Sequence, residues 1–313
     1  MEININCDLG EKSKFHSIEN DPALLNIVNS ANIACGYHAG DIETMETTIK
    51  ISKANHVSIG AHPSFNDPEN FGRKKINLNS SEIKKLIIDQ YEILQNVAIK
   101  YNEKVTHIKP HGALNNMACE DFELATILAN TIYEIDKDII YLVPTGSKME
   151  IAAKKINMKI ACEIFADRNY EDDGNLISRS KLNALIIDPA TAKKHVFNMV
   201  KNQSLNCLSG KQIPCEIDSV CIHGDNINSL NTAKSIKDDL LKNGLELKAL
   251  NKMKKFIASL NRFFALSTFP LRSYFFACLK ALFPFLKLLF LAFRYEKSSR
   301  PPVPVVFEFV SVA

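Results

Sequence analysis

The stretch Ser30–Asp41, with the sequence SANIACGYHAGD, is the part of the chain that best indicates the fold. Its first half is too apolar for a solvated surface strand, and the chain then bends at two glycines around Tyr37 and His38. Beyond Asp41 the apolar residues recur at roughly helical spacing, and Asp is a common N-cap residue. A buried strand, a polar turn and a helix form the unit by which α/β barrels and open α/β sheets present chemical groups at strand carboxyl ends.

The same unit recurs along most of the chain. Apolar runs predict seven strands, at residues 3–9, 31–35, 57–61, from 105 onward, 139–143, 159–165 and 219–224. Helical patterns predict helices at residues 22–29, 42–54, 80–101, 121–135, from 147 onward, 189–201 and 229–243. Alternating strands and helices require a parallel sheet, and seven units favour a closed β/α barrel over an open doubly wound sheet.

Charge is unevenly distributed along the chain. From Lys254 onward there are nine Lys and Arg against two Glu, whereas residues 1–253 carry 29 basic and 33 acidic side chains. The body is therefore slightly acidic, and it has no basic stripe of the kind that binds nucleic acid. We predict a β/α-barrel domain at residues 1–252 and a separate C-terminal extension at residues 253–313.

The predicted extension is hydrophobic and cationic. Twelve of the 18 Phe residues lie in it, and Lys280, Lys287 and Arg294 follow one another at intervals of seven. Charges and prolines interrupt residues 263–293, so a membrane-spanning helix is not favoured, whereas contact with an anionic membrane surface is one interpretation. An extension without a selected role, or a frame error in the coding sequence, are interpretations of at least equal weight.

The eight Cys residues are scattered, without a C-x-x-C pair. Cys7, Cys35, Cys162 and Cys221 lie in apolar, strand-like runs, where a thiol packs as a small hydrophobic group. The N-terminus does not resemble a signal peptide, because charged and polar residues start at Glu2. These features predict a reducing, cytoplasmic location.

Ionisable side chains gather at the exits of most of the predicted strands. They are Asp8, Glu11, His38, Asp41, His62, His107, Lys109, His111, Glu163, Asp167, Arg168, His223 and Asp225. Taken singly, each has an ordinary structural interpretation, such as a helix cap or a surface ion pair. In a parallel barrel, however, these exits converge on one pocket, so we expect the side chains to share a common site.

The residue types indicate roles within that pocket. Asp8, His38 and His62 come from adjacent strands and are ligands that could hold one divalent cation, Mg²⁺ or similar. Lys109 and Arg168 are cations suited to a carboxylate or a phosphate. The chain has no G-x-x-x-x-G-K-[ST] loop, no G-x-G-x-x-G fingerprint and no G-x-S-x-G elbow, so neither a phosphate loop nor a serine nucleophile is indicated.

Several of these segments also carry a family resemblance. They are Asn6–Glu11, Ser30–Asp41, Gly60–Pro63, Phe71–Arg73, His107–Leu114, Glu163–Tyr170 and Cys221–Asp225. In order and spacing they resemble the LamB/YcsF family, which supplies the A subunit of bacterial ATP-dependent 5-oxoprolinase. Asn115 departs from the family pattern, which usually has Tyr there, and the C-terminal extension lies outside it.

The resemblance implies a seven-stranded, distorted TIM-like barrel akin to sugar deacetylases. It also implies hydrolysis of the small molecule 5-oxo-L-proline to L-glutamate, with ATP as co-substrate, in a complex with two other subunits, B and C. As a hypothesis for that reaction, we assign Asp8, Lys109, His111, Asp167 and Asp225 to catalysis. Substrate binding is assigned to His38, Asp41, Arg73, His107, Glu163, Arg168 and His223.

Two other functions compete with this interpretation. A metal-dependent deacetylase acting on an N-acetyl substrate predicts stoichiometric metal and release of acetate without ATP. A non-catalytic, metabolite-binding subunit predicts 5-oxoproline binding that survives loss of Asp8. An assay with and without the two partner subunits separates these functions from a lactam-opening hydrolase.

Overall fold

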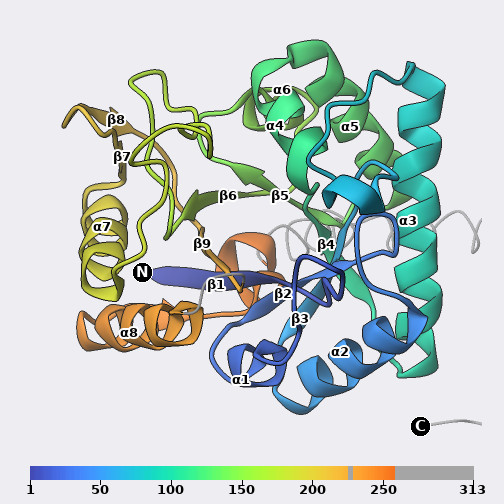
Figure 1. Cartoon of the computed structure of the whole chain (residues 1–313), viewed down its shortest axis with the longest axis horizontal. Coiled ribbons are helices and arrows are strands. Elements are labelled where there is room, and N and C mark those ends of the chain that lie inside the picture. Colours follow the sequence, from blue (N-terminus) through green and yellow to red (C-terminus); the bar gives the residue numbers. More distant parts are fainter. Residues whose placement is uncertain (225–227, 258–313) are drawn as a thin grey trace, which may run out of the picture. The chain divides into compact units, whose positions relative to one another are not determined.

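Seven parallel strands close into a barrel in the computed structural model, which describes residues 1–224 and 228–257 (Figure 1). The strands are β1 Glu2–Leu9, β2 Ser30–Ala34, β3 Ser58–His62, β4 Val105–Ile108, β5 Ile140–Pro144, β6 Ile160–Phe165 and β9 Ser219–His223. Each pairs in parallel with the next, and β9 closes the barrel by pairing with β1. The predicted seven-stranded β/α barrel is confirmed.

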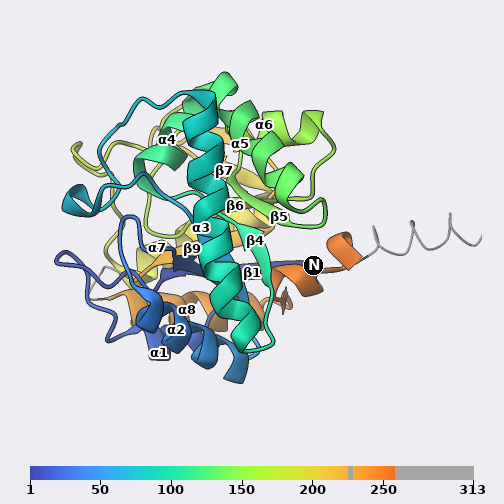
Figure 2. The same cartoon turned by 90° about the vertical axis from the view of Figure 1, so that its right-hand side faces the viewer.

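Helices surround the strands, and the long helix α3 crosses the face shown in Figure 2. Their bounds are α1 Asp21–Leu25, α2 Ile42–Ala54, α3 Ser80–Lys100, α4 Gly112–Glu120, α5 Phe122–Ile135, α6 Lys148–Lys155, α7 Pro189–Asn202 and α8 Ser229–Lys242. Two short 3-10 helices, η1 Pro68–Asn70 and η2 Leu250–Lys252, are also present, and residues 254–257 are helical. A hairpin of β7 Ser204–Asn206 and β8 Gln212–Pro214 stands apart from the barrel, and β10 Glu246–Leu247 pairs with β1.

Side chains just before α2 and α3 cap the first turns of these helices. The Asp41 carboxylate accepts a hydrogen bond of 2.7 Å from the backbone N–H of Thr44, as expected for an N-cap. Asn79 and Glu82 form a reciprocal capping box at the start of α3. The predicted starts of α2 and α3 are therefore confirmed by specific side-chain contacts.

The structure differs from the sequence prediction at α1, α4 and the β7–β8 hairpin, and it adds the short elements η1, η2 and β10. The helix predicted at 22–29 ends at Leu25, because the backbone N–H of Asn29 donates to the carbonyl of Ile5 and leads the chain into β2. Helix α4 was not predicted, since its sequence GALNNMACE has a glycine start and no strong apolar stripe. The β7–β8 hairpin was also missed, because strands of three residues give almost no periodic signal.

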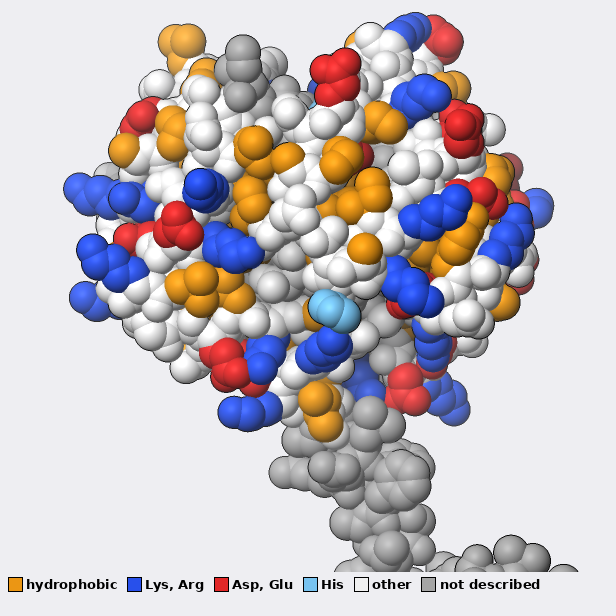
Figure 3. Space-filling view, turned by 90° about the horizontal axis from the view of Figure 1, so that it is seen from below, with side chains coloured by type: hydrophobic (Ala, Val, Ile, Leu, Met, Phe, Trp, Pro, Cys, Tyr) orange, Lys and Arg blue, Asp and Glu red, His pale blue; other side chains and the backbone are white. Residues whose placement is uncertain are grey.

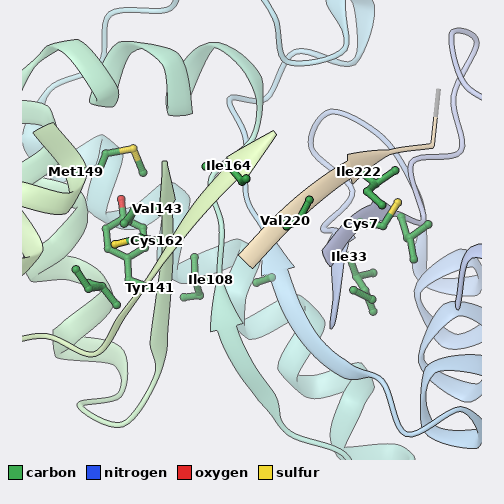
Figure 4. Packing of buried hydrophobic residues seen from close by; sticks show 14 of the residues in the cluster. Cys7, Ile33, Ile108, Tyr141, Val143, Met149, Cys162, Ile164, Val220 and Ile222 are labelled. Atoms are coloured by element: carbon green, nitrogen blue, oxygen red, sulfur yellow. The ribbon is translucent and has the colours of Figure 1, made fainter. Parts of the chain in front are cut away.

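The outward face of the barrel is apolar and packs against the helices. Side chains alternate along a strand, and the outward ones form the main core: Cys7, Ile33, Ile108, Tyr141, Val143, Cys162, Ile164, Val220 and Ile222 (Figure 4). All of them are buried. The helices thus shield one face of every strand from water.

The inward face of the barrel is unusually polar. On β1 the inward residues are Asn4, Asn6 and Asp8, and all three are buried. The amide of Asn6 donates to Ser219 Oγ at 2.8 Å and to the carboxylate of Glu163 at 3.2 Å. Barrel interiors are usually filled by branched apolar side chains. This hydrogen-bonded interior therefore points to a chemical role at the end of the barrel where the strands have their carboxyl ends.

A small apolar cluster also lies on the inward side of β5 and β6. It consists of Ile140, Leu142, Ala161, Leu250, Met253 and Phe256. The predicted domain boundary at residue 252 falls within this cluster. The remainder of the predicted extension, including the candidate membrane segment 263–293, lies outside the described residues.

Other features of the described residues bear on the sequence predictions. No helix among them combines the length and the hydrophobicity that a membrane span requires. On the face shown in Figure 3, Lys and Arg side chains stand among Asp and Glu side chains. The seven cysteines of this part of the chain are free thiols, and five of them are buried.

Candidate active site at the carboxyl end of the barrel

A cavity of about 420 Å³ opens at the carboxyl ends of the strands. Its floor includes Asp8, His62, Lys109 and His223, each at the end of a different strand or directly after it. Walls and mouth are formed by residues of the following loops and of α4, among them Glu11, Arg73, His111, Asn115, Arg168 and Arg179. The strand exits therefore converge on one cavity, as the barrel fold requires.

Lys109 is the buried cation of the cavity floor. Its Nζ atom lies 3.0 Å from Asp8 Oδ1, 3.2 Å from Glu163 Oε2 and 3.0 Å from Cys221 Sγ. Burial alone would lower the pKa of Lys109, but the neighbouring carboxylates, Asp8 foremost, raise it well above its ordinary value. The ammonium group therefore stays charged and holds two carboxylates in place.

Asp8 is fixed through one oxygen and presents the other to the cavity. Oδ1 accepts hydrogen bonds from Lys109 and, at 2.7 Å, from the amide of Asn32. Oδ2 lies 3.3 Å from His62 Nε2 and 3.8 Å from His223 Nε2. Burial would raise the pKa of Asp8, but His62 and Lys109 hold it well below its usual range. Asp8 is thus an oriented, ionised carboxylate.

Three histidines gather around the Glu11 carboxylate. Oε1 of Glu11 lies 3.1 Å from His38 Nε2, 3.2 Å from His111 Nδ1 and 3.7 Å from His62 Nε2. The His38 ring is fully buried and stacks on His111 at a centroid distance of 3.9 Å. Burial, helped by the neighbouring His111, lowers the pKa of His38 to about 3, so its ring is neutral.

His223 and Asp167 form a second, partly buried pair at the cavity. His223 Nδ1 lies 2.9 Å from both carboxylate oxygens of Asp167, and the ring stacks on Phe165 at 5.6 Å. Burial lowers the pKa of His223, but the Asp167 carboxylate more than reverses this and leaves it above the ordinary value. An imidazole so placed can carry a proton into the cavity.

Arginines supply the positive charge at the cavity wall. Arg168 is 7% exposed, and its Nη2 donates to the carbonyl of Ile177 at 2.6 Å. Among the described residues, no hydrogen-bond acceptor meets its Nε–H. Burial, followed by repulsion from Arg179, lowers the pKa of Arg168. The Nε–H group of Arg168 is therefore available to donate to an anion. A bound anion would also weaken the repulsion between Arg168 and Arg179.

Several of the residues assigned from the sequence line the cavity. They are Asp8, His62, Arg73, Lys109, His111, Arg168 and His223. Glu163 and Asp167 stand behind this lining and contact it through Lys109 and His223.

The remaining assigned residues lie elsewhere. His38 is buried beneath His111 and Glu11, and His107 is buried deeper, with Nε2 3.0 Å from Asn32 Oδ1. Asp41 does not line the cavity, because its carboxylate caps α2. Asp225 lies outside the described residues.

Some residues of the site were not assigned from the sequence. Glu11 was noted at a strand exit but received no role, and Asn6 and Asn32 received none although they hold Asp8, Lys109 and Glu163. The alternation Asn4, Asn6, Asp8 along β1 is a signal that could have identified this row of inward polar side chains.

The sequence matches the model of the LamB/YcsF family over residues 3–255. The chain belongs to the LamB/YcsF family. A relative in Clostridium beijerinckii, named as the A subunit of 5-oxoprolinase, is 41% identical over 252 residues, which is 80% of this chain and 99% of the relative. A protein of the same name in Staphylococcus aureus is 38% identical over 250 residues, 80% of this chain and the whole of the relative.

A solved structure of the same architecture is also known. The lactam utilization protein of Thermus thermophilus superposes with a TM-score of 0.74 and 30% sequence identity. The similarity covers 80% of this chain and all of that protein. The family resemblance noted in the sequence is thereby confirmed over the barrel.

Proposed function

We propose that this chain is a catalytic subunit of an ATP-dependent 5-oxoprolinase, which hydrolyses the lactam of 5-oxo-L-proline to L-glutamate. The names and near-complete coverage of its relatives support the proposal. The structural observation that carries it is the Asp8–Lys109 pair on the cavity floor, where an ionised carboxylate oxygen faces the cavity. A carboxylate held in this way suits a group that accepts a proton from water.

The reaction needs help from ATP because a five-membered lactam is a resonance-stabilised amide. Transfer of the γ-phosphoryl group of ATP to the lactam oxygen releases ADP and leaves a more electrophilic ring carbon. Water then adds to that carbon, the ring C–N bond breaks, and the nitrogen takes up a proton. A second water molecule then hydrolyses the resulting acyl phosphate, which releases phosphate and glutamate.

Asp8 and His223 suit the two proton transfers of this sequence. Oδ2 of Asp8 faces the cavity and would take a proton from the attacking water. His223, held by Asp167, would deliver a proton to the departing ring nitrogen. Their closest approach, 3.8 Å between Asp8 Oδ2 and His223 Nε2, supports these roles, because a base and an acid this close could both reach one reacting carbon.

Arg168 suits the anionic part of the substrate. Its available Nε–H could bind the 5-oxoproline carboxylate or the transferred phosphoryl group. Because the sequence has no phosphate loop, we infer that ATP is handled with the two partner subunits, B and C. We place the complex in the cytoplasm, where the free thiols of the barrel remain reduced.

The proposal is tested by reconstituting the complex with and without its partner subunits and measuring glutamate and ADP formed from 5-oxo-L-proline and ATP. Asp8→Ala and Lys109→Ala should each lower turnover by orders of magnitude, while the far-UV circular dichroism spectrum stays that of a folded barrel. Asp89→Asn, which changes a surface carboxylate paired with Lys85, is the matched control and should leave turnover unchanged.

Three results would contradict parts of this proposal. Near-normal glutamate production by both cavity variants would remove Asp8 and Lys109 from the chemistry. ATP hydrolysis dependent on 5-oxoproline by this chain alone would remove the need for the partner subunits. Release of acetate from an N-acetyl sugar without ATP would support a deacetylase in place of a lactam hydrolase.

A further inference from the structure

We propose that Glu11, His62 and His111 form a binding site for one divalent transition-metal ion, such as Zn²⁺, Mn²⁺ or Co²⁺. The three side chains come from the loop after β1, the end of β3 and the start of α4, and all three line the cavity. Binding of the ion does not depend on the proposed reaction, whereas its use in activating water rests on that proposed function. This set differs from the Asp8, His38 and His62 set expected from the sequence.

The hydrogen bonds of His62 fix which of its nitrogens is free to bind a metal. Nδ1 lies 2.6 Å from the backbone carbonyl of Lys109, and a carbonyl oxygen can only accept. Nδ1 must therefore carry the proton. In a neutral ring this leaves the lone pair on Nε2, which points toward Glu11 and His111.

His111 is fixed in the same way through its other nitrogen. Nε2 lies 2.9 Å from the backbone carbonyl of Phe71 and must donate to it. The lone pair of the neutral ring then lies on Nδ1, which faces His62 Nε2 at 3.0 Å. A backbone carbonyl that orients a ligating imidazole from behind is a regular feature of protein metal sites.

When both imidazole rings are neutral, three lone-pair-bearing atoms therefore face one another with no proton between them. His62 Nε2 and His111 Nδ1 are 3.0 Å apart, and Glu11 Oε1 lies 3.7 Å and 3.2 Å from them. All three residues are less than 8% exposed, so water does not solvate these lone pairs freely. Lone pairs that face one another in a buried site are costly, and one cation at their centre would satisfy all three.

The spacing of the donors fits a coordination shell. Ligands about 2.0–2.1 Å from a tetrahedral ion lie roughly 3.3–3.4 Å apart, and the three observed separations bracket that value. Two imidazoles and one carboxylate, with a further position open, are a ligand set that catalytic zinc sites use. Mg²⁺ prefers oxygen ligands, so the two nitrogens favour a transition metal.

His38 acts as a positioning residue for this site. Its Nε2 lies 3.1 Å from Glu11 Oε1 and donates to that carboxylate, because an unprotonated Nε2 would face the carboxylate lone pairs. Stacking on His111 fixes the plane of the His38 ring. Asp8 Oδ2, 3.3 Å from His62 Nε2, borders the same space and remains available as a base.

The test measures metal binding by the full chain alone, without partner subunits, substrate or ATP. The purified chain is stripped with a chelator and titrated with Zn²⁺ by calorimetry and with Co²⁺ by visible absorption. We expect one ion per chain, with the intense visible bands of four- or five-coordinate Co²⁺. Glu11→Gln and His111→Gln should each weaken binding at least about 100-fold, and His38→Gln by about 10–100-fold.

His56→Gln is the matched control, because it changes an exposed histidine in the turn after α2 and should leave affinity unchanged. A stripped chain that takes up no ion, or Glu11→Gln and His111→Gln chains that bind as tightly as the parent, would overturn the proposal. Preference for Mg²⁺ over Zn²⁺ and Co²⁺ would overturn the ion class. Normal metal binding without glutamate formation in the reconstituted complex would count against the proposed function only.

Discussion

The Nζ atom of Lys109 lies 3.0 Å from the Oδ1 atom of Asp8, and both side chains are more than nine-tenths buried. The same Nζ atom is 3.2 Å from Glu163, whose pKa burial raises. One ammonium group therefore compensates two carboxylates inside the barrel. This relationship couples the stability of the fold to the charge state of the cavity floor.

Lys109→Met tests that coupling through stability. Removing one member of a buried ion pair leaves uncompensated charge, so the free energy of unfolding should fall by about 3–5 kcal/mol. Urea denaturation of the full chain measures this change. Lys85→Met, which breaks an exposed pair with Asp89, should have little effect.

A double variant tests whether uncompensated charge causes the loss of stability in Lys109→Met. Adding Glu163→Gln to Lys109→Met removes one of the uncompensated carboxylates and should recover part of the lost stability. A double variant no more stable than Lys109→Met would show that charge is not the cause.

Asp167→Asn tests the role of His223. The substitution removes the negative charge that holds His223 Nδ1–H and favours its protonated form. Loss of a positioned acid should lower the rate of glutamate formation by about 10²–10⁴-fold in the reconstituted complex. Asp173→Asn, on an exposed turn, is the control. Unchanged turnover in Asp167→Asn would remove His223 from the proton transfer.

The raised pKa of Asp21 can be tested by measuring the free energy of unfolding as a function of pH. Burial raises the pKa of its carboxyl group to about 6, although Oδ2 accepts a hydrogen bond from Gly10 N–H. The folded state then holds its proton over a pH range in which the unfolded state has lost it. Stability should therefore decrease as pH rises from about 4 to about 6.

Asp21→Asn keeps an acceptor for Gly10 and removes the ionisation. Relative to the parent, the variant should gain up to about 3 kcal/mol of unfolding free energy between pH 4 and pH 7. Chemical denaturation at a series of pH values measures this difference. Parallel stability curves for the two proteins would contradict the raised pKa.

Gly60→Ala tests the packing beneath the cavity. A Cβ atom at residue 60 would lie 2.2 Å from His107 Cδ2, so the ring or the strand must move. Overpacking of this kind costs about 1–3 kcal/mol. A double-mutant cycle with His107→Ala should show a large favourable coupling, whereas additive effects would contradict the contact.

The barrel could be predicted because each strand is a strong apolar run followed by a polar exit. Helix α4 could not, since its burial depends on Ala113, Leu114 and Ala118 meeting neighbours distant in sequence. The sequence predicts that the strand exits share a cavity, but it does not predict which of the exit residues line that cavity. Asp41 fits a strand exit and a helix cap equally well in sequence, and the structure makes it the cap of α2.

The place of Glu11 among three histidines was beyond sequence reasoning. The loop after β1 turns at Gly10, which has a φ of +70°, and this turn carries Glu11 back over the barrel. His38 and His111 then meet it from loops far apart along the chain. These contacts depend on the path of the loops, and no periodic pattern in the sequence indicates them.

The most direct test of the proposed function compares binding with turnover in Asp8→Asn. The complex carrying this variant should retain 5-oxoproline binding within a few-fold of the parent, as measured by calorimetry. Its rate of glutamate formation with ATP should fall by about 10²–10⁴-fold, because the base is lost while the shape of the cavity remains. Glutamate formation at the parental rate by Asp8→Asn would contradict the account.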